Sequence, residues 1–576
     1  IIRNQENFGF VRAVNQAAEQ VKTEYLLLLN NDAVIEEATL STAINTLKSD
    51  SSIGAVGAKI KLLDGSLQEA GSIIWNDGAC LGYGRGQDPM QPEFMFQRDV
   101  DYCSGAFLLF RCDEFHKLGA FDEAFAPAYY EESDFCIRLQ KRGKRIIYNP
   151  RVNITHYEFA SSGGMEGASK LQLKHQQILC DKHPEYLSNK LANDGTNSIT
   201  ARINNKHPNI LVIDDCVPHP SLGSGYPRSA HILNSLCELN LNVSFYPLQF
   251  PVDDWGAVYS TLDSTIEVLL DRGRAGLIPL LEKRKNFYQY IMVSRLHNME
   301  IFNNIVDQDP ALLEGSKVFY DAEAIFAPRD IMKMELLGQA ITEDEKQKLI
   351  AKELDQARNA EKIISVSKME ADLYKHASYT NTVVLGHALQ SEPGNKEFDE
   401  RSGVLFVGAL RDEGSPNVDS LLWFVINVLP IIEQEIPDIE LYVVGDCSAP
   451  SLKTIECGNV QFLGRLDSIT STYNDRRLLI APTRFAAGIP HKVHEAASRG
   501  IPSVTTSLLA KQLGWKHGKQ LLVGDGAPKF AEQCVRLYRD EKLWRRVRSA
   551  GLQSISHECS DEKFQATLRG LFSHQS

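Results

Sequence analysis

The sequence has no long hydrophobic run and no closely paired cysteines. No apolar stretch approaches the roughly 20 residues that a helix needs to cross a bilayer, and no secretory signal is visible at the start. The 11 cysteines are scattered, and none belongs to a CxxC pair. This pattern argues against a disulfide framework or a zinc site and indicates buried thiols in a reducing compartment. We therefore expect a cytoplasmic protein, with association at the inner face of a membrane left open.

The sequence also has no excess of basic residues. Its 61 Lys and Arg residues oppose 74 Asp and Glu residues, which gives a formal net charge of −13 at pH 7. Such a charge argues against nonspecific binding to nucleic acid or to an anionic membrane. A hydrophobic fraction of 43% is typical of a globular protein. At 576 residues the chain is too long for one core, so several lobes are expected.

A leucine run near the start is the most informative local pattern. Tyr25-Leu-Leu-Leu-Leu-Asn-Asn-Asp32 is typical of a buried strand with polar residues where it emerges at its carboxyl end. Open α/β sheets bind ligands at that edge, and an acidic residue there can hold a divalent cation. The alternative is an ordinary strand followed by an Asn/Asp turn.

An acidic cluster lies further along the chain. Tyr129-Tyr-Glu-Glu-Ser-Asp-Phe-Cys136 places three carboxylates within four residues. Acidic residues are also favoured at any helix N-terminus by the helix dipole, which is the alternative interpretation. The stretch Arg145–Pro150 then predicts a strand, followed by Val152-Asn-Ile-Thr-His156.

Residues 1–160 resemble the GT-A-type glycosyltransferases of family 2, especially their rhamnosyltransferase-like branch. The resemblance rests on Asn7–Phe10, Asn15, Leu26–Asp32, Cys103–Ala106, Gly119–Asp122, Tyr130–Asp134 and His156. It implies an inverting, metal-dependent enzyme with a single Rossmann-like mixed sheet. The family's opening strand–helix–strand unit, which grips the nucleotide, does not precede Ile1-Ile-Arg-Asn4. We therefore expect a partial GT-A module whose N-terminal part is missing.

The same resemblance implies a cation site and a donor contact. In the family, the aspartate-rich strand end coordinates Mg²⁺ or Mn²⁺ and a later histidine completes the site, which corresponds to Asp32 and His156 here. Asn31 replaces one aspartate of the usual pair and is expected to contact the donor. A cation at this position would stabilise the departing diphosphate.

The catalytic base should be a carboxylate on the acceptor side. By the family's motif it is Glu132, where the family more often has aspartate. Glu131 or Asp134 could share or take the role, because Glu131 and Asp134 lie on one face of the predicted helix and Glu132 on another. Ser104 is expected near the donor sugar or the acceptor, although a tight strand entry would explain it equally well.

A second α/β region begins at Asn209-Ile-Leu-Val-Ile-Asp-Asp215. The strand is followed by Gly223-Ser-Gly225, a helix over Arg228–Leu239 and a strand over Asn242–Tyr246, which is a Rossmann-like beginning. A further Rossmann-like unit opens with the strand Gly403–Gly408. The sequence therefore predicts two Rossmann-like lobes after the first module.

These two lobes resemble the GT-B glycosyltransferases of family 4 over residues 208–560. The resemblance is carried by Gly223–Gly225, Gly408, Arg484, Gly488, Lys492, Glu495-Ala496, Gly500–Pro502 and Thr505-Thr506. It implies an enzyme that needs no metal and whose lobes face a cleft. Basic side chains and helix N-termini would hold the diphosphate instead. Family 4 usually has another glutamate at the position of Ala487, so the donor sugar stays open.

The expected site of the GT-B module has a donor side and an acceptor side. Donor binding is expected of Gly223, Gly225, Arg484, Gly488, Lys492 and Glu495, with Glu495 on the ribose. The acceptor-side candidates at predicted strand ends are Arg295, His297, Asp321 and Glu323. Each of these could equally be a satisfied buried polar group.

The sequence as a whole predicts two glycosyltransferase modules on one chain. We expect a GT-A-like module (1–160), a helical extension and linker (161–207), a GT-B acceptor lobe (208–390) and a GT-B nucleotide-sugar lobe (391–576). The partners would be UDP-, dTDP- or GDP-sugars and a glycan, lipid-linked or protein acceptor of surface-glycan synthesis. Two alternatives remain: only the GT-B module is active and residues 1–207 are a docking piece, or the chain is a non-catalytic carbohydrate-binding scaffold.

Overall fold

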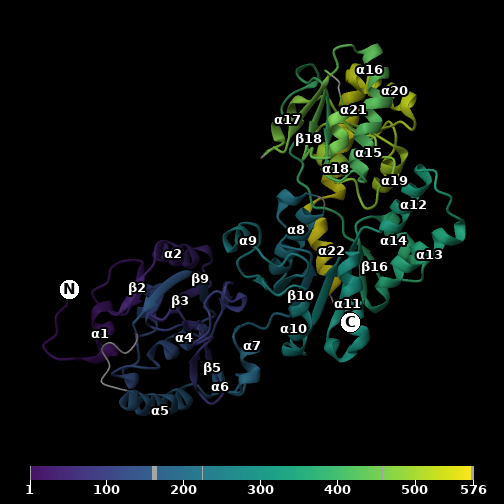
Figure 1. Cartoon of the computed structure of the whole chain (residues 1–576). Coiled ribbons are helices and arrows are strands. Elements are labelled where there is room, and N and C mark those ends of the chain that lie inside the picture. The colour runs from purple at the N-terminus through teal and green to yellow at the C-terminus, as the bar shows by residue number, and fades with distance from the viewer. Residues whose placement is uncertain (1, 158–164, 224, 456–457, 467, 573–576) are drawn as a thin grey trace. The chain divides into compact units, whose positions relative to one another are not determined.

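A computed structural model describes residues 2–157, 165–223, 225–455, 458–466 and 468–572. The predicted small-residue break at 161–167 lies partly outside these residues. The chain divides into two compact units (Figure 1). Unit 1 comprises Ile1–Asn209, Asn240–Tyr246 and Asp263–Phe287, and unit 2 comprises Ile210–Leu239, Pro247–Leu262 and Tyr288–Ser576.

Within the described residues, unit 1 is built on a mixed sheet of seven strands in the order β1-β8-β3-β9-β2, with β4 beside β3 and β7 beside β9. These strands are β1 (Tyr25–Leu29), β2 (Ala33–Ile35), β3 (Ile53–Lys61), β4 (Leu67–Ala70), β7 (Arg98–Asp99), β8 (Phe107–Arg111) and β9 (Arg145–His156). Strands β3 and β9 are parallel, whereas β8 is antiparallel to β1 and β3. The mixed sheet expected of a GT-A module is therefore present.

Helices and one small hairpin complete unit 1. The hairpin pairs β5 (Ser72–Ile74) with β6 (Cys80–Gly82). The helices of residues 2–209 are α1 (Gly9–Ala18), α2 (Thr39–Ser49), α3 (Cys112–Lys117), α4 (Glu131–Lys141), α5 (Met165–Lys182), α6 (Pro184–Leu187) and α7 (Ser198–Ala201).

The leucines of β1 face two different cores. Leu26 and Leu28 pack into a cluster rich in phenylalanine, which includes Phe110 and Phe135. Leu27 packs against the cluster on the other side of the sheet. A strand that is covered on both faces needs apolar residues at successive positions, which explains the run in the sequence.

Part of the chain beyond residue 209 belongs to unit 1. This part contains β11 (Asn242–Pro247), β12 (Glu267–Val268) and α10 (Leu277–Lys283), with β11 parallel to β12. The buried Glu267 carboxylate accepts hydrogen bonds from Arg202 (2.8 Å) and from Arg284 (2.7 Å to each oxygen). Breaking a buried ion pair of this kind typically costs about 3–5 kcal/mol. The boundary at residue 208 stays a prediction. Asn240–Tyr246 and Asp263–Phe287, which follow it in the sequence, pack with residues 1–209 in unit 1.

The first part of unit 2 contains a parallel sheet. Strands run in the order β10 (Asn209–Asp214), β13 (Tyr290–Ser294), β14 (Lys317–Glu323), β15 (Lys362–Ser365) and β16 (Thr382–Val384). Its helices are α8 (Tyr226–Glu238), α9 (Trp255–Thr261), α11 (Leu296–Gln308), α12 (Phe326–Leu336), α13 (Glu343–Leu354) and α14 (Lys368–His376). We call this part lobe A.

The second part of unit 2, lobe B, has its own parallel sheet in the order β19-β18-β17-β20-β21-β22. The strands are β17 (Val404–Val407), β18 (Leu441–Val444), β19 (Val460–Gly464), β20 (Leu478–Ala481), β21 (Ser503–Thr505) and β22 (Leu522–Val523). The helices are α15 (Pro416–Trp423), α16 (Leu429–Glu435), α17 (Thr470–Asp475), α18 (His491–Ser498), α19 (Ser507–Leu513), α20 (Ala527–Arg539) and α21 (Glu541–Glu558). The predicted α/β class with two parallel sheets is confirmed.

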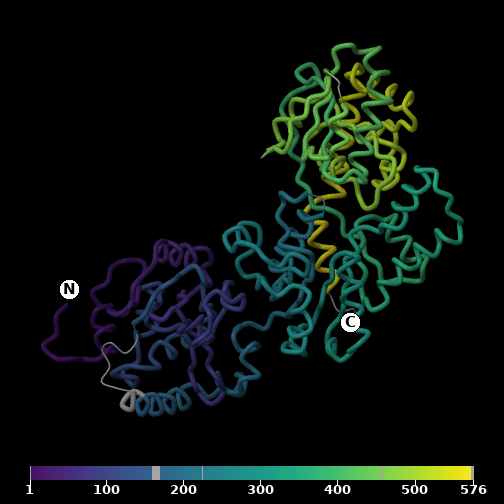
Figure 2. Tube along the Cα trace, viewed as in Figure 1, coloured from purple at the N-terminus to yellow at the C-terminus, as the bar shows by residue number. Residues whose placement is uncertain are grey.

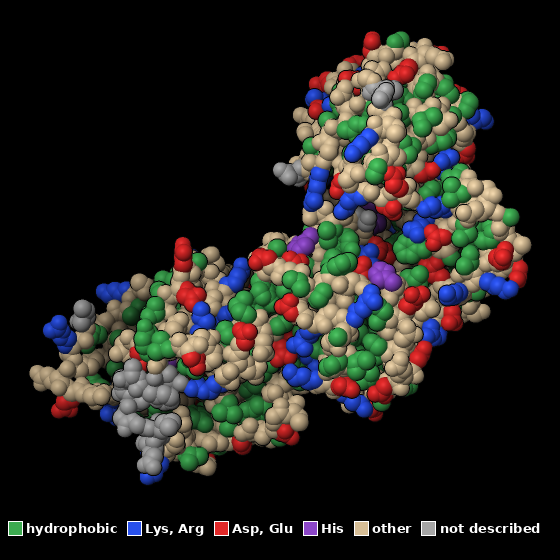
Figure 3. All heavy atoms as spheres, viewed as in Figure 1, with side chains coloured by type: hydrophobic (Ala, Val, Ile, Leu, Met, Phe, Trp, Pro, Cys, Tyr) green, Lys and Arg blue, Asp and Glu red, His purple; other side chains and the backbone are tan. Residues whose placement is uncertain are grey.

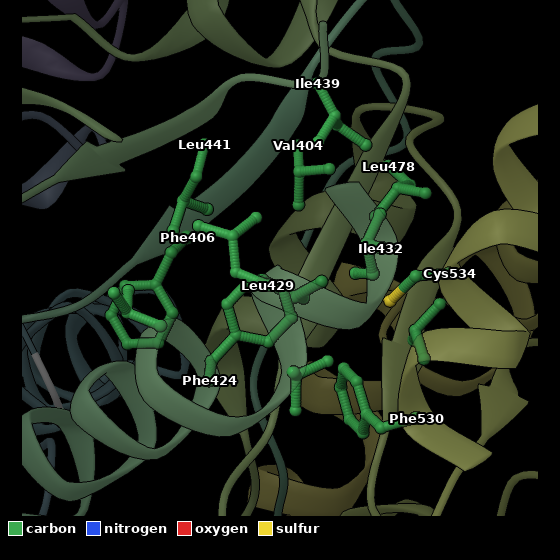
Figure 4. Packing of buried hydrophobic residues seen from close by; sticks show 14 of the residues in the cluster. Val404, Phe406, Phe424, Leu429, Ile432, Ile439, Leu441, Leu478, Phe530 and Cys534 are labelled. Carbon is green, nitrogen blue, oxygen red and sulfur yellow. The ribbon is translucent and has the colours of Figure 1, made fainter. Parts of the chain in front are cut away.

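Lobe B has a continuous apolar core. Phe406 and Leu441 of its sheet pack with Phe424, Leu429 and Phe530 of the helices that cover it (Figure 4). After α21 the chain returns to lobe A as α22 (Asp561–Phe572), which runs among the lobe A segments in Figure 2. Gln565 of α22 donates hydrogen bonds to Ser235 (2.8 Å) and Glu238 (2.7 Å) of α8. The last helix therefore ties the two lobes together.

Among the described residues, no helix combines the length and apolar character needed to cross a membrane. Lys and Arg side chains are interspersed with Asp and Glu over the face visible in Figure 3.

Candidate donor and acceptor sites

The predicted metal motif lies in a tight turn between β1 and β2. The Asn30 N–H donates to the Ala106 carbonyl (3.1 Å), and the Ala33 N–H donates to the Asn30 carbonyl (3.2 Å). The Asp32 carbonyl accepts from the Tyr157 N–H (2.9 Å) at the end of β9. These backbone bonds bring Asp32 to the end of β9, while Asn31 stays exposed in the turn.

Asp32 and His156 are in direct contact. Asp32 Oδ1 lies 3.1 Å from His156 Nε2, and Asn30 Nδ2 lies 3.2 Å from the same nitrogen. On the other side of the ring, His156 Nδ1 donates to Gln68 Oε1 (2.8 Å). Because Gln68 Oε1 can only accept, His156 Nδ1 carries the proton of that hydrogen bond, and Nε2 is the nitrogen that faces Asp32 and could bind a cation. A glutamine behind a histidine fixes a metal-binding tautomer in this way.

This pair fits a divalent cation as two ligands of a larger set. A carboxylate oxygen and an imidazole lone pair face each other, and both are ligands of such cations. In the described part of the chain, no group of three or more His, Cys, Asp and Glu side chains could hold a metal. Mg²⁺ commonly takes one or two protein carboxylates and completes its shell with substrate phosphates and water. The arrangement is therefore suited to a cation shared with a diphosphate.

At the start of α4, Glu131 is buried and Glu132 is half-buried, and neither carboxylate is fully hydrogen bonded. Both residues preceding the helix, Tyr129 and Tyr130, have positive φ (76° and 75°), a strained conformation typical of functional sites. Among the described residues, Oε2 of Glu131 and Oε2 of Glu132 have no hydrogen-bond partner. Burial raises the pKa of Glu132 to about 7, and burial beside Glu132 raises that of Glu131 well above its ordinary value. A carboxylate with a pKa near neutrality is suited to general base catalysis.

Asp134 has a different environment. Its fully buried carboxylate is paired with Arg138 Nε (2.7 Å), Lys182 Nζ (2.6 Å) and His183 Nε2 (2.8 Å). These partners lower its pKa to about 2 despite its burial. A carboxylate neutralised by three cationic or hydrogen-bonding partners is a poor base, so the structure favours a structural role for Asp134 over the alternative catalytic one. Its partners fasten α5 to α4.

Strand β4 connects the metal pair to the glutamates. Gln68 holds His156, and the next residue, Glu69, accepts from the Ser104 N–H (3.0 Å). The Gly105 N–H donates to the Glu132 carboxylate, and the negative charge of Glu69 also raises the pKa of Glu132. The sequence analysis did not identify Gln68 or Glu69. The available signal was that two adjacent polar residues, one of them acidic, lie between the apolar ends of strand β4. Ser104 itself shapes its loop, because its Oγ accepts from the Ala106 N–H (3.1 Å).

The polar residues predicted in lobe A gather at the carboxyl ends of its strands. Arg295, which follows β13, donates to Asp214 at the end of β10 (2.7 Å) and pairs with Glu323 at the end of β14 (2.7 Å). Burial raises the pKa of Glu323 to about 7. A Cβ on Gly225 would lie 1.4 Å from Glu323 Oε1, so a larger residue there would displace the Glu323 carboxylate. Gly223 has a positive φ of 71° and no atom near its Cβ position.

Two further lobe A candidates are held in ion pairs. His297 Nε2 lies 2.5 Å from Asp215 Oδ1, and this contact raises the pKa of His297. Asp321 accepts a bidentate pair of hydrogen bonds from Arg228 (2.7 and 2.9 Å), with both side chains buried. Asp321 thus positions Arg228, whereas half of the His297 side chain is exposed to solvent.

The predicted donor residues of lobe B lie around the start of α18. Lys492 Nζ donates to Asn417 Oδ1 (2.5 Å), and burial lowers its pKa to about 8. Arg484 pairs with Asp419 of α15, and Glu495 Oε2 lies 3.9 Å from His491 Nδ1. Lys492 has no carboxylate partner among the described residues.

The donor loop of lobe B touches lobe A. The Gly488 N–H donates to Glu370 Oε1 (3.0 Å), and a Cβ on Gly488 would lie 3.3 Å from Cβ of Ala324. Ala324 follows Glu323 directly, and Glu370 also accepts from the Ile325 N–H (3.1 Å). The donor loop and the polar strand ends of lobe A are therefore neighbours, as the GT-B resemblance predicts.

Two family models match separate parts of the chain. Residues 1–119 match glycosyl transferase family 2, and residues 401–540 match glycosyl transferases group 1. The matches fall on the module with Asp32 and on the lobe with Lys492.

The curated relatives match about a quarter to a third of the chain. They include the O-antigen biosynthesis protein RfbC of Myxococcus xanthus, which is 28% identical over 159 residues, 27% of this chain and 12% of the relative. Rhamnosyltransferase WbbL of Escherichia coli is 26% identical over 162 residues, 26% of this chain and 61% of the relative. The N-acetylglucosaminyl-diphospho-decaprenol L-rhamnosyltransferase of Mycobacterium tuberculosis is 27% identical over 202 residues, 31% of this chain and 65% of the relative. The chain thus spans less than two thirds of the length of each of these relatives.

Among solved structures, sucrose-phosphate synthase from Thermosynechococcus elongatus overlays with a TM-score of 0.49 at 12% identity, over 64% of this chain and 98% of that chain. The two family matches lie on one polypeptide without overlapping. The chain therefore carries a match to glycosyl transferase family 2 over residues 1–119 and a separate match to glycosyl transferases group 1 over residues 401–540.

Proposed function

We propose that the chain transfers two sugars in sequence from nucleotide-sugar donors to a growing surface glycan or glycoconjugate. The donors would be UDP-, dTDP- or GDP-sugars. For the first module, the proposal rests on the hydrogen bonds of two adjacent residues of β4, Gln68 and Glu69. Gln68 orients His156 against Asp32, and Glu69 holds the loop whose Gly105 contacts Glu132. One strand thereby links a cation-binding pair to a carboxylate with a pKa near neutrality.

In the first module, Glu132 is the proposed base. Its free Oε2 takes the proton of the acceptor hydroxyl while the hydroxyl oxygen bonds to the anomeric carbon and the bond from that carbon to the diphosphate breaks. Asp32 and His156 would hold Mg²⁺ or Mn²⁺, which stabilises the negative charge of the leaving diphosphate when bound. Asn31 and Ser104 are proposed to contact the donor and the acceptor side.

The names of the relatives indicate the sugar and acceptor class. Two relatives are rhamnosyltransferases, and one is named for an acceptor sugar joined through a diphosphate to a polyprenol. We accordingly propose a deoxyhexose such as L-rhamnose for the first transfer and a lipid-diphosphate-linked sugar as acceptor. The scattered cysteines of the sequence support a reducing, cytoplasmic site of action.

In the second module, lobe B is proposed to hold the donor without a metal. Lys492, Arg484 and the Gly488 loop would contact the diphosphate, and Glu495 would accept hydrogen bonds from the ribose. Arg295, His297 and Glu323 of lobe A are proposed to face the acceptor, with Gly225 and Gly223 shaping the loop beside them. Asp321 acts through Arg228.

The proposal is tested with the full chain and two variants, Glu132→Gln and Lys492→Ala. Nucleoside-diphosphate sugars, including those of L-rhamnose, are supplied with a lipid-diphosphate-linked acceptor, with and without a chelator. We expect Glu132→Gln and the chelator to abolish the same transfer, and Lys492→Ala to abolish the other. A Glu132→Gln variant with both transfers intact would instead make residues 1–207 a docking piece. Binding of sugars without turnover by the unmodified chain would favour a scaffold.

A further inference from the structure

A histidine of lobe A faces the donor loop of lobe B. His387 lies on the segment after β16, where the neighbouring Leu385 carbonyl accepts two hydrogen bonds from Arg228 (3.1 and 3.0 Å). Its ring meets that of His491, the first residue of α18, with centroids 4.6 Å apart and planes inclined at 65°. The two imidazole rings, one from each lobe, are therefore in contact.

Neither imidazole is satisfied by the protein. Among the described residues, no side chain or backbone group is hydrogen bonded to the ring nitrogens of the half-buried His387. The nearest carboxylate to His491 is that of Glu495, at 3.9 Å, which exceeds hydrogen-bond distance. No side chain caps α18, whose first turn is preceded by Pro490. Two backbone N–H groups at this helix start are already bonded, that of His491 to the Ile489 carbonyl (2.8 Å) and that of Val493 to the Pro490 carbonyl (2.9 Å), so the two imidazoles are the donors that an anion would meet here.

The charges around the pair also favour an anion. Arg228 lies near His387 but is already neutralised by Asp321, and the His494 ring lies on the same helix as His491. Lys492 donates to an amide oxygen and not to a carboxylate. Glu495 is the acidic group facing His491, at 3.9 Å from its Nδ1.

We propose that His387 and His491 together bind the diphosphate of the second module's nucleotide sugar, so that lobe A supplies a donor-binding residue. This inference rests on the proposed function of the group 1 module. An imidazole N–H from each lobe would donate to phosphate oxygens beside Lys492. Donor binding would therefore require lobe A and lobe B to be in contact. It would favour the same contact that places Ala324, the residue after Glu323, beside Gly488 of the donor loop.

The proposal has a consequence for the pH dependence of binding. Burial and the neighbouring cationic groups hold the pKa of His387 well below its ordinary value, and burial lowers that of His491. A bound diphosphate raises both values, because it stabilises the imidazolium form. Binding therefore takes up protons, and the affinity increases as the pH falls.

The test uses the full chain and isothermal titration with UDP, dTDP, GDP and inorganic pyrophosphate, with a chelator present so that the metal-dependent first module does not contribute. The titrations are run at pH values of about 6 and about 8, where a phosphate-bound imidazole titrates. The variants are His387→Gln and His491→Gln, and the matched control is His376→Gln, an exposed histidine at the end of α14 in lobe A. We expect each variant to weaken binding about tenfold at the lower pH, the loss of one hydrogen bond to a charged group. The affinity of each should also depend less on pH than that of the control. Ligand-free thermal unfolding should match the unmodified chain.

The outcomes separate this inference from the function on which it rests. If the unmodified chain binds none of the four probes, the donor site of the second module is refuted together with the diphosphate role of the histidines. If it binds one of them and His387→Gln equals the control at both pH values, the group 1 function stands and the role of His387 is overturned. A His387→Gln variant that fails to fold is replaced by His387→Asn, and the His491→Gln result decides independently.

Discussion

The substitution Asp134→Asn is expected to destabilise unit 1 strongly while leaving its chemistry intact. The Asp134 carboxylate is fully buried and paired with Arg138, Lys182 and His183. Its pKa is lowered to about 2 from the ordinary 3.8. That difference corresponds to about 2 kcal/mol of folding free energy near neutral pH, which is lost as the pH falls from about 4 to about 2. Removing the charge also leaves buried cations uncompensated, so the total cost should be about 2–4 kcal/mol.

The substitution Glu132→Gln should have the opposite effect on stability. The pKa of Glu132 is raised to about 7 from the ordinary 4.5, so the folded state prefers the protonated form. Protonation of Glu132 therefore contributes about 3 kcal/mol to the stability of the folded state below its ordinary pKa of 4.5. This contribution is lost as the pH rises through about 7. Glutamine resembles the protonated acid and does not titrate. The Glu132→Gln variant should therefore be more stable than the unmodified chain above neutral pH, and it should have lost the first transfer.

Calorimetry and hydrogen exchange measure this contrast. For a unit of this size, about 1 kcal/mol corresponds to a shift in Tm of roughly 2–4 °C, so Asp134→Asn should lower the Tm of unit 1 by about 5–10 °C. Amide exchange should accelerate in α4 and α5, which Asp134 joins. Transfer at a temperature well below the Tm should be retained. Unchanged Tm and exchange together with loss of the first transfer would refute the reasoning and make Asp134 the base.

Three further outcomes are expected. The rate of the first transfer should rise with pH and level off above about 7, because Glu132 acts as a base only when ionised; a rate that is constant across this range would contradict the assignment. Gln68→Ala should raise the Mn²⁺ concentration for half-maximal first transfer by about 10–100-fold, whereas the exposed Gln20→Ala should not; equal behaviour of the two would exclude a role for Gln68 in orienting His156. Glu267→Gln should lower the stability of unit 1 by about 3–5 kcal/mol in calorimetry, since Arg202 and Arg284 lose their shared counter-ion; an unchanged Tm would show that Asp263–Phe287 are not an integral part of the unit.

The sequence predicts best those features whose determinants are close together in the chain. Strand Tyr25–Leu29 is observed as expected, because apolar residues covered on both sides form an uninterrupted run. The turn Asn30–Asp32 follows from its polar residues, while its contact with His156 was expected from the family resemblance and not from the local pattern.

Features set by distant partners were missed or left ambiguous. Helical spacing could not distinguish Asp134 from Glu132, because the groups that neutralise Asp134 include Lys182 and His183 from another helix. Strand Phe107–Arg111 was not predicted, although it pairs with both β1 and β3. Gln68 and Glu69 are single polar residues whose meaning depends on His156 and Ser104.

The division of the chain shows the same limit. The boundary at residue 208 stays a prediction, and the structure adds that Glu267 is buried against Arg202 in unit 1. An ion pair between residues 65 positions apart has no signature in a local window. The packing of segments across a predicted linker must be read from the structure.

The central claim is that one chain carries two separate transfer sites. Mass spectrometry of a single acceptor incubated with the full chain and a panel of nucleotide sugars tests it most directly. The unmodified chain should add two sugars, one of the variants Glu132→Gln and Lys492→Ala should stop after one, and the other should add none. Addition of both sugars by either variant, or loss of both additions in both variants when the one-sugar intermediate is supplied, would contradict the claim.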